Sequence, residues 1–315
     1  MAKTELFVPP GPGTGARLDV YLAGQVPGLS RAAARRLIDE GMVLVNAKAG
    51  KAGLRIREGD RIAVELVTPD AMAGGLKPQP IPLKILHADE DVIVLDKPSG
   101  MVVHPGAGNR ERTLANALLA LYPEIAGVGP EERPGIVHRL DKGTSGVMVA
   151  ARSPRAYASL LGQFKRHDVR KTYLGLVHGK VAAAEGHIDW PIGRHATKRK
   201  MISTHSKSPR EAETFFRVLE RLPESTLLEI KPVTGRTHQI RVHLAAAGHP
   251  IVGDGLYGRK KVSKRYHRLF LHARSLTFIH PSTGERLTFA SPLPPDLEAV
   301  LVGERKKAGL TSRGQ

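Results

Sequence analysis

One carboxylate stands among cations in the segment GIVHRLDKGTSGVMVAARS, residues 135–153. Asp141 lies two positions after Arg139 and directly before a lysine, and small and apolar residues follow it. A neighbouring cation favours the ionised form of a carboxylate, and that form is the one that acts as a nucleophile or a base. A lone aspartate in a turn is more often structural, because its side chain readily bonds nearby backbone groups. The residue types alone therefore leave both roles open for Asp141.

Other common kinds of reactive site do not fit the sequence. Ser145 stands in GTSG, which lacks the G-x-S-x-G nucleophile elbow of a serine hydrolase. We expect Ser145 and Thr144 to bond backbone groups around Asp141 and to fix its position. There is no Walker A or G-x-G-x-x-G phosphate loop. On a helix, His238 and His243 would point about 140° apart, so we expect no shared metal ion.

A second cation stands before a predicted helix in the stretch KPVTGRTHQIRVHLAAAGHP. Thr237 is a suitable cap, Ile240 and Leu244 recur at helical spacing, and Gly248 is a typical residue after a helix end. Arg236 then lies in the loop that leads into this helix. From there its side chain can reach a neighbouring site.

The charge of the chain indicates a polyanionic partner. The 315 residues carry a formal net charge of +18, and the pI is about 10.3. Residues 194–210 and 259–268 are basic runs without an acidic residue. Neither run is an amphipathic helix with an apolar face, so an anionic lipid surface is the weaker interpretation. A generic basic surface is the other alternative, and we expect nucleic acid.

Composition excludes several classes of protein. The sequence has no cysteine, which excludes a disulfide framework, thiolate zinc sites and a cysteine nucleophile, and which fits a reducing compartment. The first residues lack the apolar core of a signal peptide, and no apolar run approaches the ~20 residues of a membrane span. We therefore expect a cytoplasmic protein without membrane contact, acting as a monomer.

A segment rich in Pro, Gly and Ala, residues 68–82, predicts a linker between a small and a large domain. We place the small domain at residues 1–72, the linker at 73–83, the large domain at 84–300 and a basic tail at 301–315.

The small domain predicts an α/β unit. Leu18, Tyr21 and Leu22 form one face of a short helix. A second helix follows Ser30, a good N-cap, and it carries three arginines: Arg31, Arg35 and Arg36. Residues 42–46 and 61–66 are strand-like. Such a helix suits phosphate binding, and a solvated helix face is the equal alternative for these arginines.

The large domain predicts an α+β fold with a large mixed, mainly antiparallel sheet flanked by helices. Two sets of segments carry this expectation. Strand-like runs cover residues 92–95, 146–151, 172–177 and 226–233, and helical patterns cover residues 114–121 and 157–164.

Residues 16–66 resemble an S4 RNA-binding domain. The motifs are ARLDVYLAGQ, LSRAAARRLIDEGMVLVNAK and REGDRIAVEL, in that order. The resemblance implies that Ser30, Arg31, Arg35 and Lys48 lie on or near an RNA-binding face. Arg36 and the basic residues Lys198, Arg199 and Lys200 are further candidates for RNA contacts.

HRLDKGTSG resembles the signature of the RluA family of pseudouridine synthases. The match includes VLDKPSGMVVHPGAGN, KTYLGLVHG, TGRTHQIRVHLAAAGHPIVGDGLYG and LHARSLTFIHPSTGE, in the family's order, over residues 85–293. The resemblance implies that Asp141 is the catalytic aspartate and that Arg236 pairs with it. Tyr173 would stack on the target uracil and act as a base. Arg139 would hold the base out of the RNA stack, and Leu271 would lie against the uracil.

The chemistry that this resemblance implies is the isomerisation of uridine to pseudouridine. The N1–C1′ bond breaks, the base rotates, and C5 bonds to C1′. No electrons leave and no group is added, so we expect no cofactor and no metal. The expected partner is RNA, namely 23S ribosomal RNA or the assembling large ribosomal subunit. Two alternatives stay open: a non-catalytic RNA-binding or ribosome-assembly factor, and a synthase that acts on other ribosomal or transfer RNA uridines.

Overall fold

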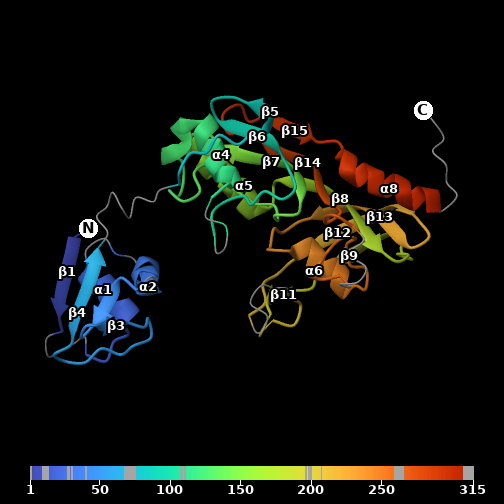
Figure 1. The fold of residues 1–315 in the computed structure, drawn as a ribbon. Coiled ribbons are helices and arrows are strands. Elements are labelled where there is room, and N and C mark those ends of the chain that lie inside the picture. Colours follow the sequence, from blue (N-terminus) through green and yellow to red (C-terminus); the bar gives the residue numbers. More distant parts are fainter. Residues whose placement is uncertain are drawn as a thin grey trace. The chain divides into compact units, whose positions relative to one another are not determined.

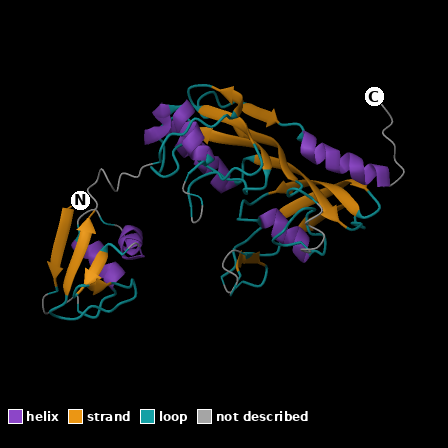
Figure 2. Ribbon diagram, in the orientation of Figure 1, coloured by secondary structure: helices purple, strands orange, loops and turns teal. Residues whose placement is uncertain are grey.

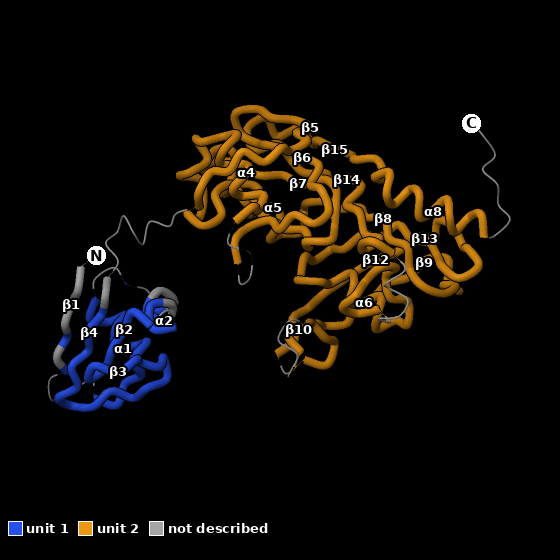
Figure 3. Tube along the Cα trace, viewed as in Figure 1, with its two compact units in different colours: residues 1–75 blue, residues 76–315 orange. Residues whose placement is uncertain are grey.

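The chain divides into two compact units in a computed structural model of the protein. Contacts between α-carbons separate Met1–Gly75 from Leu76–Gln315 (Figure 3). The structure describes residues 2–8, 14–26, 29, 31–39, 41–66, 76–106, 109, 111–195, 197, 201–206, 208–258 and 266–307. The division falls within the segment for which the sequence predicts a linker.

The first unit is a small sheet with two helices (Figure 1). Four antiparallel strands lie in the order β1 (Ala2–Phe7), β4 (Arg61–Leu66), β2 (Val43–Val45) and β3 (Lys48–Ala49). The helices are α1 (Leu18–Gln25) and α2 (Arg31–Asp39). Leu18 and Leu22 are fully buried, as their helical spacing predicts, and they belong to one core with Ile62 and Val64 of β4. The predicted small α/β domain is confirmed.

The second unit is built on one nine-stranded sheet (Figure 2). Along the sheet the strands are β5 (Lys84–Ala88), β6 (Val92–Lys97), β7 (Ser145–Ala151), β14 (Leu271–Ile279), β8 (Arg170–His178), β13 (Ser225–Pro232), β12 (Thr214–Arg221) and β9 (Glu185–Ile188). β15 (Arg286–Ala290) pairs with β14 beside this path. Of these pairings, β7 with β14 is parallel and the others are antiparallel. The prediction of a mixed, mainly antiparallel sheet is confirmed.

Helices flank this sheet. α4 (Leu114–Leu121) begins at a capping box between Thr113 and Asn116, and the short 3-10 helix η1 (Pro123–Gly127) follows it. α5 (Pro154–Arg166) begins where the Ser153 side chain accepts a hydrogen bond from a backbone N–H. α6 (Gln239–Ala246) lies near the two-stranded sheet of β10 (Gly193–Arg194) and β11 (Ile202–Ser203).

The last helix corrects one predicted boundary. α8 spans Pro295–Lys307, so it crosses position 300, where the sequence predicts the start of a basic tail. Leu301 is buried, and Glu304 accepts a hydrogen bond from Ser225 Oγ of β13. Residues 301–307 therefore belong to the second unit, because this turn of α8 contributes to its packing.

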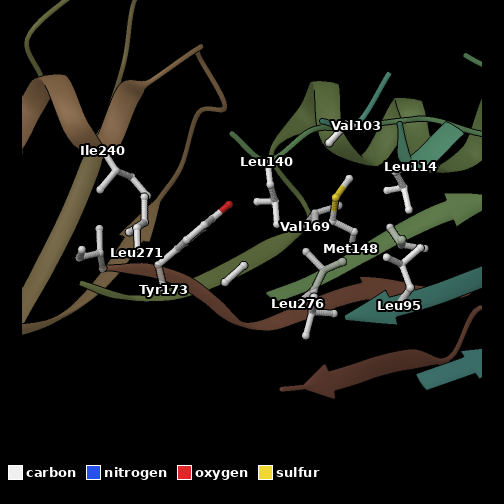
Figure 4. Close-up of a cluster of buried hydrophobic side chains, with 14 of the residues drawn as sticks. Leu95, Val103, Leu114, Leu140, Met148, Val169, Tyr173, Ile240, Leu271 and Leu276 are labelled. Carbon is white, nitrogen blue, oxygen red and sulfur yellow. The ribbon is translucent and has the colours of Figure 1, made fainter. Parts of the chain in front are cut away.

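The core of the second unit extends to the lining of a pocket. β7 is buried along its whole length, and Met148 from this strand packs in one cluster with Leu95 and Leu276. Tyr173 and Leu271 belong to the same cluster, at the end where its side chains meet a pocket (Figure 4). Each fully buried Leu or Met contributes roughly 1.5–3 kcal/mol. This packing fixes the strands that position the pocket.

Candidate active site

A pocket of about 650 Å³ opens beside the ends of β8 and β14 and the start of α6. This volume is in the usual range for a small-molecule site. The structure brings together in its lining all five residues that the sequence predicts for catalysis or base binding: Arg139, Asp141, Tyr173, Arg236 and Leu271. Among the described lining residues, Asp141 is the single acidic one. Six lining residues are cationic: Arg133, Arg139, Lys165, Lys171, Arg236 and Arg241.

Two turns hold the Asp141 backbone in place. The Thr144 N–H donates to the Asp141 carbonyl at 3.0 Å, which closes the first turn. The second turn follows β6, where the Gly100 N–H donates to the Lys142 carbonyl at 2.7 Å. Lys97 is fully buried and donates from Nζ to the carbonyls at positions 98 and 101 of that second turn, at 2.8 and 2.9 Å. Burial lowers the pKa of Lys97 to about 7.

The Asp141 carboxylate is paired with Arg241, in the first turn of α6. Arg241 Nη1 donates to Oδ2 of Asp141 at 2.9 Å. The same guanidinium makes two further bonds to Asp254, from Nε at 2.7 Å and from Nη2 at 2.9 Å. Burial alone would lower the pKa of Arg241, but the hydrogen bonds and charges of Asp254 and Asp141 outweigh it and raise that pKa. Arg241 is therefore a permanent cation that orients one oxygen of Asp141.

This pairing corrects the prediction that Arg236 pairs with the carboxylate. Arg236 lines the same pocket, but it is exposed, and its Nε donates to the Glu211 carbonyl at 3.0 Å. The sequence carries a signal for Arg241 in its place within the predicted helix. A cation in the first turn opposes the helix dipole, so such a residue is expected to have a specific partner.

The start of α6 also differs from the sequence prediction. Thr237 does not cap the helix, which begins at Gln239 after His238 in the N-cap position. The Gln239 side chain instead accepts hydrogen bonds from the loop before the helix. Its Oε1 accepts from the Arg236 N–H at 3.0 Å and from Thr234 Oγ1 at 2.6 Å. His243 bonds Thr214 Oγ1 and the Trp190 carbonyl. Among the described residues, no cluster of three or more His, Cys, Asp or Glu side chains is placed to hold a metal ion.

Tyr173 and Leu271 form an apolar wall of the pocket. Tyr173 is 9% exposed and Leu271 3% exposed, and Figure 4 shows both beside Ile240 of α6. Burial, assisted by the charge of Asp141, raises the pKa of the Tyr173 phenol. Because the phenolate is disfavoured, the geometry suits a stacking role for Tyr173 better than a role as base.

Arg139 lies on the rim of the pocket. Arg139 precedes Asp141 by two positions in the sequence. Its side chain is exposed and lines the opening of the pocket. Its guanidinium donates no hydrogen bond to another described residue, so it is available to an incoming ligand.

Ser145 and Thr144 have environments that differ from the prediction. Ser145 Oγ lies 2.9 Å from Nδ1 of His272 and accepts a hydrogen bond from Arg268 at 2.7 Å. It therefore ties β7 to β14 rather than bonding backbone around Asp141. Thr144 fixes the turn through its backbone N–H, while its buried hydroxyl has no hydrogen-bond partner among the described residues.

The predicted RNA contacts are described only in part. Arg31 and Arg35 are exposed on α2, where Arg31 Nε lies 3.1 Å from Asp19 and Arg35 Nε lies 3.9 Å from Asp39. Lys48 is exposed and follows a tight turn at positions 46–47 with positive φ. The remaining candidates lie outside the described residues or, for Arg36, have an undescribed side chain: Ser30, Arg36, Lys198, Arg199 and Lys200.

Comparisons with known proteins agree with this organisation. A family model described as RNA pseudouridylate synthase matches residues 91–246, and an S4 domain model matches residues 16–62. An uncharacterized RNA pseudouridine synthase of Synechocystis sp. is 44% identical over 300 residues, 93% of this chain and 90% of that protein. Ribosomal large subunit pseudouridine synthase D of Xanthomonas campestris is 40% identical over 311 residues, 95% and 92% of the two chains. The structure of human RNA Pseudouridylate Synthase Domain Containing 1 matches with a TM-score of 0.58 and 30% identity, over 70% of this chain and 88% of that one.

Proposed function

This chain belongs to the RNA pseudouridine synthase family, and on that basis we propose that it isomerises specific uridines of 23S ribosomal RNA with Asp141 as the reacting carboxylate. The observation that carries the proposal is the ion pair of Asp141 with Arg241 inside a pocket whose other charged lining residues are cations. Arg241 engages Oδ2. Oδ1 is therefore the oxygen available to the substrate.

The surroundings of Asp141 suit chemistry at the ribose of a bound uridine. An ionised carboxylate acts at C1′ as a nucleophile, or removes a proton from the sugar in a glycal-type route. Both routes use the Asp141 carboxylate, and Arg241 holds it in place through the hydrogen bond to Oδ2 at 2.9 Å. The N1–C1′ bond then breaks, the detached uracil rotates, and its C5 bonds to C1′ before the C5 proton is lost. The reaction itself needs neither a cofactor nor a metal, because nothing is oxidised and no group is added.

The apolar wall explains how a base that starts inside an RNA stack is accepted. Flipping a uridine out of the stack costs a few kcal/mol, and stacking on an aromatic side chain recovers ~1–3 kcal/mol. Tyr173 offers that aromatic face, with Leu271 beside it. Arg139 on the rim is placed to contact the RNA that the base leaves.

Ribosomal RNA of the large subunit is the substrate that the other observations favour. Relatives at about 40% identity are named ribosomal large subunit pseudouridine synthase D. The S4 domain and the net charge of +18 fit a large structured RNA. We propose a cytoplasmic monomer, since one chain supplies the whole described pocket. Among the described residues, no helix is long and apolar enough to cross a membrane.

A non-catalytic assembly factor is the second candidate, and the pocket argues against it. Burying Arg241 and Asp254 is costly unless the charges serve a purpose, because desolvation of an ion pair often exceeds its attraction. Here the pair orients a third charged group, Asp141, toward an open pocket. An RNA-binding protein without chemistry has no use for that arrangement.

The test is a comparison of pseudouridine maps of total RNA from cells with and without the gene. We expect loss of pseudouridine at specific 23S positions, restored by the wild-type protein and not by the Asp141→Asn variant. Loss at transfer RNA or small-subunit positions would replace the proposed substrate. Unchanged maps in every RNA would contradict the enzymatic proposal.

A further inference from the structure

His238 has a backbone conformation that few side chains adopt. Its φ is 56° and its ψ is 16°, in the left-handed region, where His, Asn and Asp are the better tolerated of the non-glycine residues. The side chain does not cap α6, although His238 occupies the N-cap position. Its ring lines the pocket beside Asp141 instead. The conformation therefore serves the position of the ring rather than the start of the helix.

Tyr257 determines which ring nitrogen of His238 carries a proton. The Tyr257 hydroxyl accepts a hydrogen bond from the Ile202 N–H at 2.9 Å and lies 2.9 Å from Nδ1 of His238. With that N–H already accepted, we assign the phenol as the donor to Nδ1, which puts the proton of the neutral imidazole on Nε2. The Arg241 guanidinium lies 5.1 Å from the centre of the Tyr257 ring and restrains it further. The geometry thus presents an Nε2–H to the pocket.

Burial favours the neutral form of the His238 ring. Burial lowers its pKa below the ordinary value; the charges of Asp141 and Asp254 oppose this shift, and those of Arg241 and Arg139 reinforce it. A neutral ring forms no ion pair with Asp141. His238 therefore stands beside the carboxylate as a hydrogen-bond donor rather than as a counter-ion.

The distance between the donor and the carboxylate leaves room for a substrate atom. Nε2 of His238 lies 4.0 Å from Oδ1 of Asp141, which is too long for a hydrogen bond. A substrate atom can lie about 3 Å from both Nε2 and Oδ1 at once, because these two atoms are 4.0 Å apart. A uridine whose ribose meets Oδ1 consequently brings the atoms next to C1′ within reach of Nε2–H.

We propose that His238 contacts the substrate by donating its Nε2–H to O2 of the bound uracil, the carbonyl next to N1. The inference rests on the proposed function, since it takes Asp141 to act at the ribose. When the N1–C1′ bond breaks, its electron pair goes to the uracil, and the negative charge spreads onto O2. A fixed donor at O2 stabilises that charge in the transition state more than in the bound uridine. The Nε2 proton stays on the ring, so the contact needs no further acid or base.

The same donor serves both orientations of the base. Rotation about the axis through N3 and C6 exchanges N1 with C5 and O2 with O4. After rotation, O4 occupies the place that O2 held, and C5 faces C1′. The hydrogen bond to His238 is then restored in the product orientation, which favours this rotation over other motions of the detached base.

Two substitutions separate this contact from a structural role. His238→Asn tolerates the left-handed backbone, but its amide ends where Nδ1 was and does not reach the Asp141 side. His238→Gln extends an amide N–H to the place of Nε2. His249→Asn is the matched control, because His249 lies beyond the other end of α6, bonds the His178 carbonyl and does not line the pocket. Single-turnover rates on a 23S fragment, RNA affinity and melting temperature are measured for each, beside Asp141→Asn.

We expect His238→Asn to lower the rate at saturating enzyme by about 10- to 100-fold, the effect of losing a hydrogen bond to a charged group. RNA affinity and melting temperature should stay unchanged, His238→Gln should recover most of the rate, and His249→Asn should match the wild type. A full rate in His238→Asn, beside an inactive Asp141→Asn, overturns this inference alone. The inference is also overturned if His238→Asn loses only RNA affinity or stability, or if His238→Gln is no faster than His238→Asn. An active Asp141→Asn overturns the proposed function and this inference together.

Discussion

Each unit combines arginine with a buried aspartate, but in opposite proportions. In the first unit, Asp19 is 1% exposed and is shared by Arg17 and Arg31, which are 44% and 62% exposed. In the second unit, Arg241 is 12% exposed and is shared by Asp254 and Asp141, which are 0% and 16% exposed.

The difference shows how one pair of residue types serves two purposes. Two arginines on one aspartate leave a net positive charge at the surface, which suits the phosphates of RNA. Two aspartates on one buried arginine leave one carboxylate, that of Asp141, at the pocket, which suits a reacting group. The role of each cluster therefore depends on its numbers of arginines and aspartates and on which of these side chains is buried. Each cluster can be changed by mutation without altering the other.

Among the changes that test this difference between the two units, the largest effect is expected from replacing Arg241, the shared arginine of the second unit. Arg241→Lys keeps the positive charge but loses the planar fork that engages both carboxylates, so Asp141 loses its orientation. We expect the single-turnover rate to fall at least about 100-fold, as displacement of a catalytic group does. Arg236→Lys is the matched control, since Arg236 lines the same pocket without touching Asp141. A larger loss in Arg236→Lys than in Arg241→Lys would contradict this assignment.

A smaller effect on the reaction rate is expected from removing the whole first unit, with its aspartate and two arginines. A protein starting at Leu76 should fold, because the core of the second unit consists of its own residues. It lacks Arg31, Arg35 and Lys48, so the slope of log affinity against log salt should flatten by about 0.7–0.9 per lost phosphate contact. The rate at saturating enzyme should persist, because the pocket is complete. An unchanged salt slope would mean that the S4 domain does not bind this RNA.

The smallest effect is expected in the pH dependence of stability, and it comes from a buried cation of the second unit, Lys97. Lys97 is fully buried and has a pKa of about 7, below its unfolded value of about 10.4. Between these two values the unfolded chain binds more protons than the folded one, so stability rises with pH. We expect the free energy of unfolding to increase by about 1–3 kcal/mol from pH 7 to 9 relative to the Lys97→Met variant. Parallel curves for the two proteins in urea titrations would contradict a depressed pKa in Lys97.

The sequence predicts the elements better than the contacts between them. Leu18 and Leu22 repeat at helical spacing, and residues 92–95 form an apolar run, so local patterns suffice for α1 and β6. The pairing of Asp141 with Arg241 joins residues 100 positions apart. That of Ser145 with His272 joins residues 127 positions apart and depends on the parallel pairing of β7 with β14.

In the site, too, local patterns do not predict long-range contacts, and the start of α6 is the example. Sequence reasoning places Asp141, Tyr173 and Leu271 in one site, and they do line one pocket. It expects Thr237 to cap α6, whereas a left-handed His238 precedes the helix. The His238 ring lies 2.9 Å from the hydroxyl of Tyr257, 19 positions away, and no local pattern predicts that contact. The place of Arg241 in the first turn of α6 signals that it has a partner, but not which one, since Asp254 lies on a later loop.

The central claim is that the Oδ1 side of Asp141 performs the chemistry. Its most direct test is tritium release from C5-labelled uridine in a 23S fragment, with wild-type enzyme and with Asp141→Asn. The variant keeps the size of the side chain and the Arg241–Asp254 pair, so RNA affinity should be unchanged. We predict that its release falls by at least about 1,000-fold, the scale for loss of a reacting group. Release within tenfold of the wild type would contradict the account.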